Sequence, residues 1–205
     1  MHRGHIRIPA LAIVAVNRFD SVARLNFRRS NFRHGMAAHS LQSVLLSRGR
    51  RPYWRFMRVA LFQPEIAGNV GAVIRLCACM GTPLDIIEPC GFPFSDRSLK
   101  RAGMDYVDGV QLVRHSDWDA FKAAAPGRII LLTTKGDTPL TNAGFVASDT
   151  LLFGKESAGV PIDIRAACDV RVVVGMAGGF RSLNLAVTAG IALHEALRQT
   201  GELPQ

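Results

Sequence analysis

Short apolar runs alternate with amphipathic stretches through most of the chain after residue 57. Runs of strand length occur at 59–62, 84–87, 110–113, 128–133, 150–153 and 171–174. The last three are continuous and aliphatic or β-branched, as is typical of parallel strands that are covered on both faces. Stretches with helical spacing lie between the runs, at 69–80 and 117–124, and a longer one follows at 183–199. The pattern predicts an α/β fold with a mostly parallel sheet and flanking helices.

Polar residues and glycines predict where the helices begin and end. Asn69 is the predicted N-cap of the first helix and Gly81 is its stop. Ser182 is the predicted N-cap of the last helix. A helical turn is expected at 98–102. Buried positions are expected in the first helix at Val70, Val73, Ile74 and Cys77, and in the last at Leu185, Ile191, Leu193 and Leu197.

Three loops directly follow predicted strands in the second half of the chain. They are Leu131-Leu-Thr-Thr-Lys-Gly136, Phe153-Gly154 and Val174-Gly-Met176. Open α/β sheets bind ligands at the carboxyl ends of their strands, so these loops are candidate ligand loops. Taken one at a time each has an ordinary explanation, since Gly154 is also compatible with a simple turn and Thr133 with a strand end.

The first predicted helix carries a stripe with little side-chain bulk. Gly68, Gly71, Ala72 and Arg75 are three or four residues apart and are expected on one face. Small residues ahead of one long cation would let a substrate backbone approach closely and receive a charged donor. The alternative is tight packing against a neighbouring helix, with Arg75 in a surface ion pair.

Charge is divided very unevenly along the 205 residues. Residues 1–56 contain eleven arginines, no lysine and a single acid, Asp20, which gives a net charge of +10. Residues 57–205 contain fourteen Lys and Arg against fifteen Asp and Glu, which gives −1. The high isoelectric point therefore belongs to the first 56 residues, and it is no argument that the globular part binds nucleic acid.

The first 56 residues admit several explanations. The apolar run 9–16 after a basic start imitates a signal peptide, but no small-residue cleavage site follows it. An Arg-rich, acid-poor lead also resembles an organellar transit peptide, and a basic arm that attracts RNA is a further alternative. We favour a mostly disordered extension or translation from an upstream start, with Met57 as the natural start of the domain.

The cysteines and histidines predict no metal site. Cys77, Cys79, Cys90 and Cys168 form no C-x-x-C pair and have no histidines at zinc-ligand spacing, so we expect reduced thiols packed in the core of a cytoplasmic protein. His115 and His194 have no partner cluster in the sequence and are expected to be structural. Apolar runs stay well below the ~18 residues of a membrane span, so no membrane association is expected.

Three motifs after residue 57 carry a family resemblance when they are taken together. They are Asn69-Val-Gly-Ala-Val-Ile-Arg75, Leu152-Phe-Gly-Lys-Glu-Ser-Ala-Gly159 and Arg181-Ser-Leu-Asn-Leu-Ala186. In this order and spacing they resemble the signatures of the SpoU branch of the SPOUT RNA methyltransferases. Within that branch, Phe62-Gln-Pro-Glu-Ile66, Arg101-Ala-Gly-Met-Asp-Tyr106 and Thr133-Thr-Lys-Gly136 look like the tRNA (cytidine/uridine-34-2′-O)-methyltransferases.

The resemblance covers about residues 57–200 and implies a fold and a function. The fold would be a SPOUT domain over 57–205, whose last strands and helix thread a C-terminal trefoil knot. The activity would be transfer of a methyl group from S-adenosylmethionine, without metal, to the 2′-hydroxyl of the wobble pyrimidine. The expected partners are the tRNA anticodon stem-loop and a second copy of the chain, in a homodimer that uses the last helix and the Asn69 region.

The resemblance also assigns site residues. Arg75 falls on the family's catalytic arginine, with Asn69, Glu156, Ser182 and Asn184 as further catalytic-site residues. The cofactor pocket would consist of Leu132, Thr133, Gly154, Val174, Met176, Ser182 and Leu183.

Three rival interpretations remain open. The first keeps the fold and the reaction but changes the target to another tRNA or rRNA ribose. The second is a non-catalytic RNA-binding paralogue, against which the joint presence of the five catalytic-site residues argues. An unrelated nucleotide-binding enzyme is disfavoured because no G-x-x-x-x-G-K-[ST] loop exists. Ser157 is one residue out of register for a G-x-S-x-G nucleophile elbow.

Overall fold

The computed structural model describes residues 57–94, 106–125 and 127–205. The proposed extension 1–56 and the helical turn expected at 98–102 lie outside the described residues, so the division of the chain at Met57 stays a prediction. None of the described helices is long and apolar enough to cross a membrane.

One seven-stranded sheet organises the described residues. The strands are β1 (Arg58–Phe62), β2 (Leu84–Ile87), β3 (Leu112–His115), β4 (Ile129–Leu132), β5 (Thr138–Pro139), β6 (Thr150–Phe153) and β7 (Val170–Val173). Their order across the sheet is β3-β2-β1-β6-β4-β7-β5, and every pairing is parallel. The carboxyl ends of all strands therefore lie along one edge of the sheet, as the α/β prediction requires.

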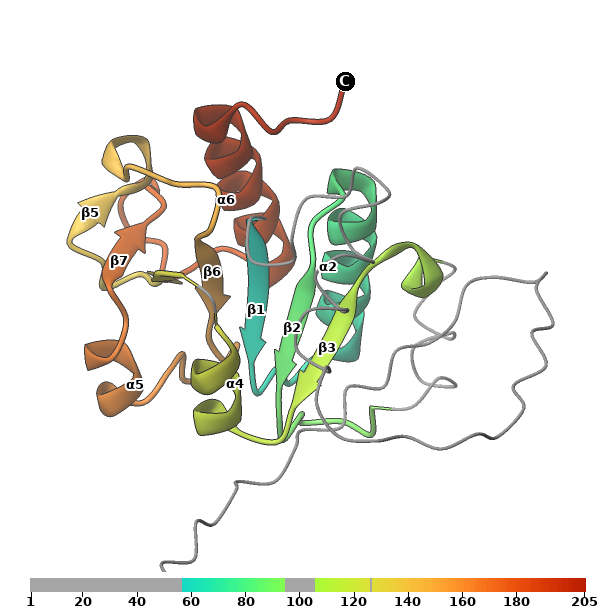
Figure 1. The fold of residues 1–205 in the computed structure, drawn as a ribbon. Coiled ribbons are helices and arrows are strands. Elements are labelled where there is room, and N and C mark those ends of the chain that lie inside the picture. Colours follow the sequence, from blue (N-terminus) through green and yellow to red (C-terminus); the bar gives the residue numbers. More distant parts are fainter. Residues whose placement is uncertain (1–56, 95–105, 126) are drawn as a thin grey trace, which may run out of the picture.

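Helices cover both faces of this sheet (Figure 1). The helices are α2 (Ala67–Met80), α4 (Trp118–Ala124), α5 (Ile162–Ala166) and α6 (Leu185–Thr200), with 3₁₀ turns η2 (Val107–Gly109) and η3 (Leu140–Asn142). The long helices α2 and α6 pack against each other over one face. The short helices α4 and α5 contribute Phe121 and Ile164 to the core on the other face.

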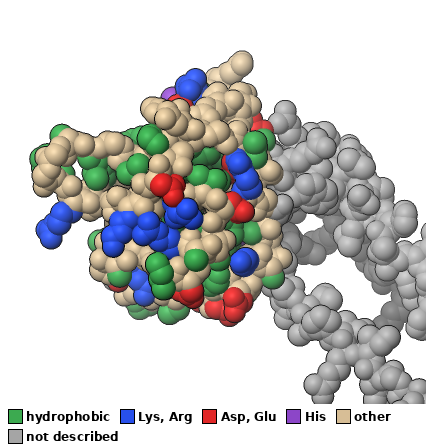
Figure 2. All heavy atoms as spheres, turned by 90° about the vertical axis from the view of Figure 1, so that its left-hand side faces the viewer, with side chains coloured by type: hydrophobic (Ala, Val, Ile, Leu, Met, Phe, Trp, Pro, Cys, Tyr) green, Lys and Arg blue, Asp and Glu red, His purple; other side chains and the backbone are tan. Residues whose placement is uncertain are grey.

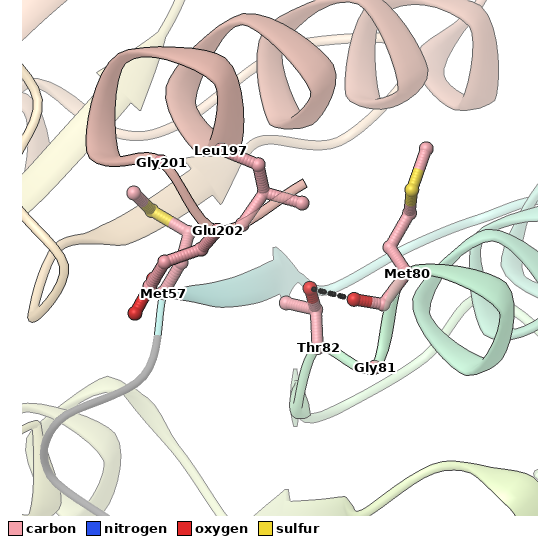
Figure 3. A pocket seen from close by; sticks show the side chains of 7 residues that line it. All are labelled: Met57, Met80, Gly81, Thr82, Leu197, Gly201 and Glu202. Carbon is pink, nitrogen blue, oxygen red and sulfur yellow. Dashed lines mark hydrogen bonds between the residues drawn. The ribbon is translucent and has the colours of Figure 1, made fainter. Parts of the chain in front are cut away.

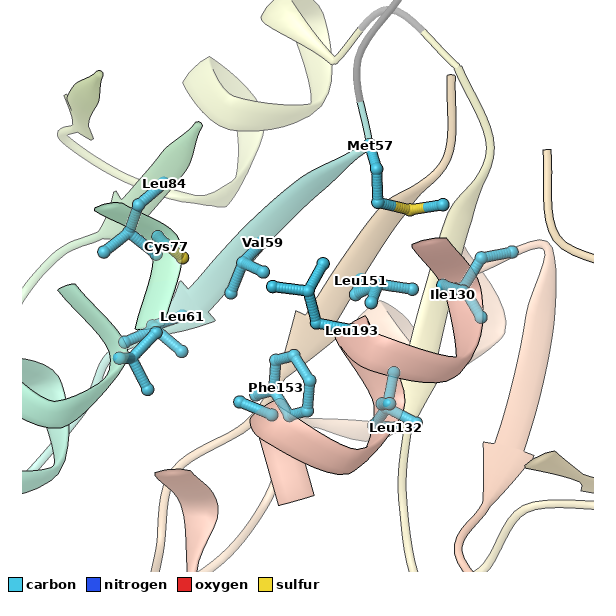
Figure 4. Packing of buried hydrophobic residues seen from close by; sticks show 14 of the residues in the cluster. Met57, Val59, Leu61, Cys77, Leu84, Ile130, Leu132, Leu151, Phe153 and Leu193 are labelled. Carbon is cyan, nitrogen blue, oxygen red and sulfur yellow. The ribbon is translucent and has the colours of Figure 1, made fainter. Parts of the chain in front are cut away.

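Alternation along the central strands builds the two cores. Val59 and Leu61 of β1 point to the side of α2 and α6, where Figure 4 shows them near Leu193 and Cys77. Ala60 of the same strand packs in the second core, with Phe121. Because successive strand residues point to opposite faces, a continuous apolar run supplies both cores at once.

The structure corrects several predicted boundaries. β3 begins at Leu112, two residues after the predicted start at Val110. Asn69 lies inside α2, whose N-cap is Ile66, and Asn184 is the N-cap of α6, in place of the predicted Ser182. Ile191 is 41% exposed, whereas the other three apolar positions predicted to be buried in α6 are buried. The short β5 and α5 were not predicted, since two and five residues give too little periodicity.

A buried ion cluster ties the first three strands together. Arg58, 2% exposed, donates from Nε to Asp85 Oδ2 at 2.8 Å, and its Nη2 lies 2.6 Å from the same oxygen. His115 Nε2 lies 2.8 Å from Asp85 Oδ1 and packs edge-on against Phe121. His115 thus has a partner that the sequence did not reveal. Removing one member of such a cluster leaves a buried charge without compensation.

Replacing Asp85 should therefore destabilise the fold strongly. We expect Asp85→Asn to lower the free energy of unfolding by about 3–5 kcal/mol, because Arg58 keeps its charge and loses its counter-ion. Urea unfolding followed by circular dichroism measures the change. The control Asp137→Asn breaks an exposed pair with Arg171 and should leave the unfolding midpoint unchanged. Equal effects of the two substitutions would contradict the structural role of the buried cluster.

Candidate functional site

A cleft of about 910 Å³ opens at the carboxyl ends of β4, β6 and β7. Its walls come from the three loops that follow these strands, from the start of α2 and from the segment that leads into α6. All seven residues predicted to hold the cofactor line it: Leu132, Thr133, Gly154, Val174, Met176, Ser182 and Leu183. Asn69, Glu156 and Asn184 line it as well, whereas Arg75 does not.

The loop after β6 is closed upon itself. Lys155 and Gly159 exchange two backbone hydrogen bonds, with N···O distances of 3.0 and 2.9 Å. A Cβ on Gly154 would lie 2.5 Å from the carbonyl carbon of Gly159, so only glycine fits there without a shift of the backbone. Gly159 itself adopts a φ of +69°, which side-chain-bearing residues rarely do. Gly154 is therefore more than a simple turn, because it lets the loop close beside the cleft.

A hydrogen-bonded chain links the three sequence motifs. The Glu156 carboxylate accepts hydrogen bonds from Asn69 Nδ2 at 3.0 Å and from the backbone N–H of Glu65 and Ile66 at 2.8 and 3.3 Å. Asn69 Oδ1 accepts from Asn184 Nδ2 at 2.9 Å. Glu156 thereby places a negative charge at the start of α2, where the helix dipole favours it. Asn184 Oδ1 is also occupied, since it caps α6 by accepting from Ala186 N and Val187 N.

Glu65 and Ser157 add a second link that the sequence did not indicate. Glu65 accepts from Ser157 Oγ at 2.8 Å and from Ser157 N at 2.9 Å. These bonds, the side-chain one first, hold the pKa of Glu65 below its ordinary value of 4.5. The link is therefore intact at neutral pH, and its contribution is lost only as the pH falls through this lowered pKa. Glu65 stands in the motif Phe62-Gln-Pro-Glu-Ile66, but nothing in the sequence indicated its partner.

Arg75 lies two turns further along α2, apart from the Asn69 cluster. Its side chain is exposed, and its guanidinium carbon lies 4.6 Å from the centre of the Tyr106 ring. Arg75 Nη2 also donates to Tyr106 Oη at 3.2 Å. The stripe expected around it is incomplete, because Gly71 is buried while Gly68 and Ala72 are exposed. The structure thus brings Asn69, Glu156 and Asn184 together and leaves Arg75 outside the cleft wall.

Positive charge is concentrated around the cleft. Its lining contains four cations, Lys135, Lys155, Arg165 and Arg181, and one carboxylate, Glu156. Arg165 donates to the backbone carbonyl of Lys135, which keeps two of these residues adjacent. Figure 2 shows Lys and Arg side chains gathered on the face that carries β5, β7 and α5. The near-neutral net charge after Met57 therefore hides a local excess of positive charge.

The segment before α6 exposes apolar side chains beside the predicted residues. Phe180 is 75% exposed and Leu183 is 39% exposed, and Ser182 lies between exposed neighbours. Ser182 faces the cleft and does not cap the helix, since Asn184 does. Its hydroxyl therefore remains a candidate ligand group.

A second, smaller pocket of about 270 Å³ lies at the opposite end of the strands (Figure 3). It sits between the last turns of α2 and α6, beside Met57. Thr82 donates there to the backbone carbonyl of Met80 at 3.4 Å. Glu202 is the only charged residue in its lining, and the pocket lies at the amino ends of the strands, away from the three motifs. The large cleft is therefore the better candidate site.

The four cysteines are free thiols in the structure. Cys77 and Cys168 are buried as predicted, but Cys79 is exposed on α2. Burial raises the pKa of Cys168 to about 11, so this thiol stays protonated at neutral pH. Among the described residues no three His, Cys, Asp or Glu side chains form a group that could hold a metal ion.

Comparison with known proteins identifies the family. Residues 57–194 match the SpoU rRNA Methylase family. The chain belongs to the SpoU methylase family.

This chain matches individual relatives over between 58% and 96% of their length. A tRNA (cytidine(34)-2′-O)-methyltransferase of Beijerinckia indica is 51% identical over 148 residues, which are 71% of this chain and 92% of that protein. A solved structure described as giving insights into the 2-OH methylation of C/U34 on tRNA is 42% identical, with a TM-score of 0.67 over 71% of this chain and 96% of its own. The SpoU methyltransferase AviRb from Streptomyces viridochromogenes, solved with AdoMet, is 28% identical, with a TM-score of 0.61 over 71% and 58%.

Neutralising Glu156 should loosen the junction of the three motifs. In Glu156→Gln one carboxylate oxygen becomes an NH₂ group, which faces either Glu65 N or the donors of Ile66 and Asn69 and cannot accept from them, so we expect a loss of about 1–3 kcal/mol in the free energy of unfolding. Differential scanning calorimetry measures it. Glu195→Gln is the matched control, since the side chain of Glu195 pairs with the 58% exposed Arg198 on α6, so its replacement should change the melting temperature much less than that of Glu156. Unchanged melting of both variants would show that the junction does not support the fold.

Proposed function

We propose that this protein uses S-adenosylmethionine to methylate the 2′-hydroxyl of the wobble pyrimidine, nucleotide 34, in the tRNA anticodon. The observation that carries the proposal is the meeting of the three family motifs at one cleft, in a chain that matches tRNA (cytidine(34)-2′-O)-methyltransferases over 92% of the length of one of them. A ribose elsewhere in tRNA or rRNA is the alternative target.

The cleft residues fit the proposed cofactor. Leu132, Val174 and Met176 supply apolar contact for an adenine ring, and backbone groups at Gly154 and Leu183 are available to its polar edge. The partial exposure of Val174 and Met176 leaves the wall accessible to a ligand of this size, while Leu132 is buried at its base. Bound there, S-adenosylmethionine supplies an electrophilic methyl group, and this chain needs only to position the ribose hydroxyl and help remove its proton.

Arg75 is the proposed catalytic residue, with Asn69, Glu156, Ser182 and Asn184 around the cleft. A guanidinium is always protonated in proteins, so it is a poor proton acceptor. We assign it to orienting the nucleotide through its phosphate and to stabilising the developing alkoxide charge. Tyr106 stacks against the guanidinium and accepts its hydrogen bond, which restricts where that charge can point. Asn69 and Asn184 position the loops, because their amides are already engaged in hydrogen bonds with Glu156, with each other and with the start of α6.

The homodimer is part of the proposal. Val187 and Ile191 of α6 are 51% and 41% exposed, and on α2 the small residues Gly68 and Ala72 are exposed, so the packed helix pair presents a partly apolar outer surface. A second copy of the chain on this surface would cover it. Since Arg75 lies on the same helix and outside the cleft of its own chain, such a dimer would also offer it a route to a partner's cleft.

The trefoil knot is the finer part of the proposed SPOUT fold. η3 and the loop after it pack against α6, with Leu140 and Phe145 in the same core as Leu193. Phe145 N donates to Gln199 Oε1 at 3.2 Å, near the end of α6. The loop between β4 and β6 thus lies against the final helix, as threading would require.

A tRNA substrate places the enzyme where the tRNA pool is, which we propose is the cytoplasm.

Cofactor binding and product mapping test the function. Calorimetric titration in EDTA should give saturable binding of S-adenosylmethionine and of its demethylated product, because no metal is required. Incubation with undermodified tRNA, followed by mass spectrometry of nuclease fragments, should place one methyl group on nucleotide 34. A methyl group on another nucleotide would support the alternative target. Absence of binding at millimolar ligand would refute the proposed cofactor. Binding of the cofactor without methyl transfer to tRNA would support the non-catalytic paralogue.

Arg75→Ala should abolish most methyl transfer while cofactor affinity stays nearly unchanged. Loss of one charge-stabilising group in a site lowers the rate by on the order of 10²–10³. Arg75→Lys keeps a charge without the planar fork, so a phosphate or alkoxide contact should leave measurable activity. Single-turnover methylation with undermodified tRNA is the measurement, and titration with the cofactor is the control. Near wild-type turnover of Arg75→Ala would refute the assignment.

A further inference from the structure

A second group of planar side chains lies at the carboxyl edge of the sheet, away from the cofactor cleft. The rings of Phe92 and Phe94, in the loop after β2, stack with centroids 6.1 Å apart and an interplanar angle of 29°. The guanidinium carbon of Arg114, on β3, lies 4.7 Å from the centre of the Phe94 ring. Three planar groups from two neighbouring strand ends are thus assembled into one cluster.

The positive charge of Arg114 is neutralised by the Glu88 carboxylate. Its Nε donates to Glu88 Oε1, and its Nη2 forms an ion pair with the same oxygen. Nevertheless the Arg114 side chain is 47% exposed. A guanidinium that is neutralised by its carboxylate has little charge left for a phosphate. What it offers a ligand is its exposed plane and the remaining N–H groups.

Planar groups of this kind suit unpaired nucleobases. Proteins that bind single-stranded RNA loops stack the bases on aromatic rings or on Arg guanidinium planes. Phe92 and Phe94 are half-buried and pack against the core beneath α2, so the group is held by the fold. A rigid platform stacks a base with a smaller loss of conformational entropy than a free side chain would.

The position of the group agrees with the proposed reaction. In the sheet order, β2 and β3 are two and three strands away from β6, whose loop forms the middle of the cleft. At a strand spacing of about 4.8 Å this separation is roughly 10–15 Å along one edge. That span suits a base that neighbours the methylated nucleotide, since both would lie on the same edge.

We propose that Phe92, Phe94 and Arg114 form a stacking platform for an unpaired nucleobase of the RNA substrate, close to the nucleotide that is methylated. The inference rests on the proposed function only for the identity of the RNA. The platform then contributes to recognition of the loop, while the basic residues around the cleft contact phosphates. Glu88 is a positioning residue, because it fixes the guanidinium over Phe94.

The test is RNA affinity as a function of salt. The probe is a fluorescein-labelled anticodon stem-loop, and the full-length protein is titrated by anisotropy at several salt concentrations. Arg114→Lys keeps the charge and loses the plane, and Phe94→Leu removes the ring beneath it. We expect each to weaken binding on the order of tenfold, as loss of one stacked base does, without a change in the slope of log K against log salt.

Controls separate stacking from charge and from misfolding. Lys122→Ala removes an exposed cation from α4, on the opposite face of the sheet, and should bind as the wild type does. Titration with S-adenosylmethionine checks that each variant is folded. If Phe94→Leu fails this check, Arg114→Lys alone tests the stacking, because the Arg114 side chain is 47% exposed and its replacement should leave the fold intact.

The opposite results would overturn the platform. Wild-type affinity of Arg114→Lys, together with an Arg114→Ala salt slope reduced by about one, would show a phosphate contact instead. A wild-type protein that does not bind the hairpin would refute the platform for this RNA. In a second readout, 2-aminopurine at one loop position should lose fluorescence on wild-type binding and not with Arg114→Lys. A wild type that binds the hairpin but does not methylate it would refute the proposed function alone.

Discussion

The carboxylate of Glu156 is the interaction on which the arrangement of the site depends. It comes from the loop after β6 and accepts hydrogen bonds at the start of α2, including one from Asn69, which in turn binds Asn184 at the start of α6. Three segments that are far apart in the chain meet there. An acceptor with one negative charge satisfies several donors at once, and a charged acceptor gives stronger hydrogen bonds than a neutral one. The junction therefore fixes the loop after β6 and the start of α6 relative to α2.

The parallel sheet explains why the site lies where it does. With all pairings parallel, the loops after β4, β6 and β7 emerge at one edge, and so does the loop with Phe92 and Phe94. A single edge therefore carries the cleft with its basic lining and, farther along, a cluster of planar side chains. An extended RNA loop can contact such a row without any large movement of the protein. The electrostatic part of this surface comes from how charge is placed, since the net charge after Met57 is close to zero.

Rigid and open parts of the molecule are clearly separated. The strands β1, β2, β4 and β6 are buried along their whole length, and the ion cluster around Asp85 ties β1, β2 and β3 together. The segment that leads into α6 is exposed instead, with Phe180 at its tip. A buried frame with exposed loops is suited to binding, because the loops can adjust to a ligand while the strand ends stay in place.

The sequence by itself determined the α/β class, the order of the longer strands and helices, and seven of the residues that line the cleft. Continuous aliphatic runs fixed β4 and β6 closely, because parallel strands buried on both faces leave an unambiguous pattern. The motif resemblance predicted seven residues to hold the cofactor, and all seven line the cleft. Ser182 is one of them, although periodicity alone predicted it to be a helix cap. Short elements such as β5 carry too few residues for a pattern and were missed.

Only the tertiary structure decided which side chains bind one another. The pairing of Glu65 with Ser157, of Arg75 with Tyr106 and of Arg114 with Phe94 joins residues 20 or more positions apart, and no local pattern reports such contacts. The same holds for the cap of α6, where Asn184 replaced Ser182 because its amide also reaches Asn69. Periodicity records which face of an element is apolar. The hydrogen-bond partner of a polar side chain depends on where the other loops end, and that is fixed only when the sheet is assembled.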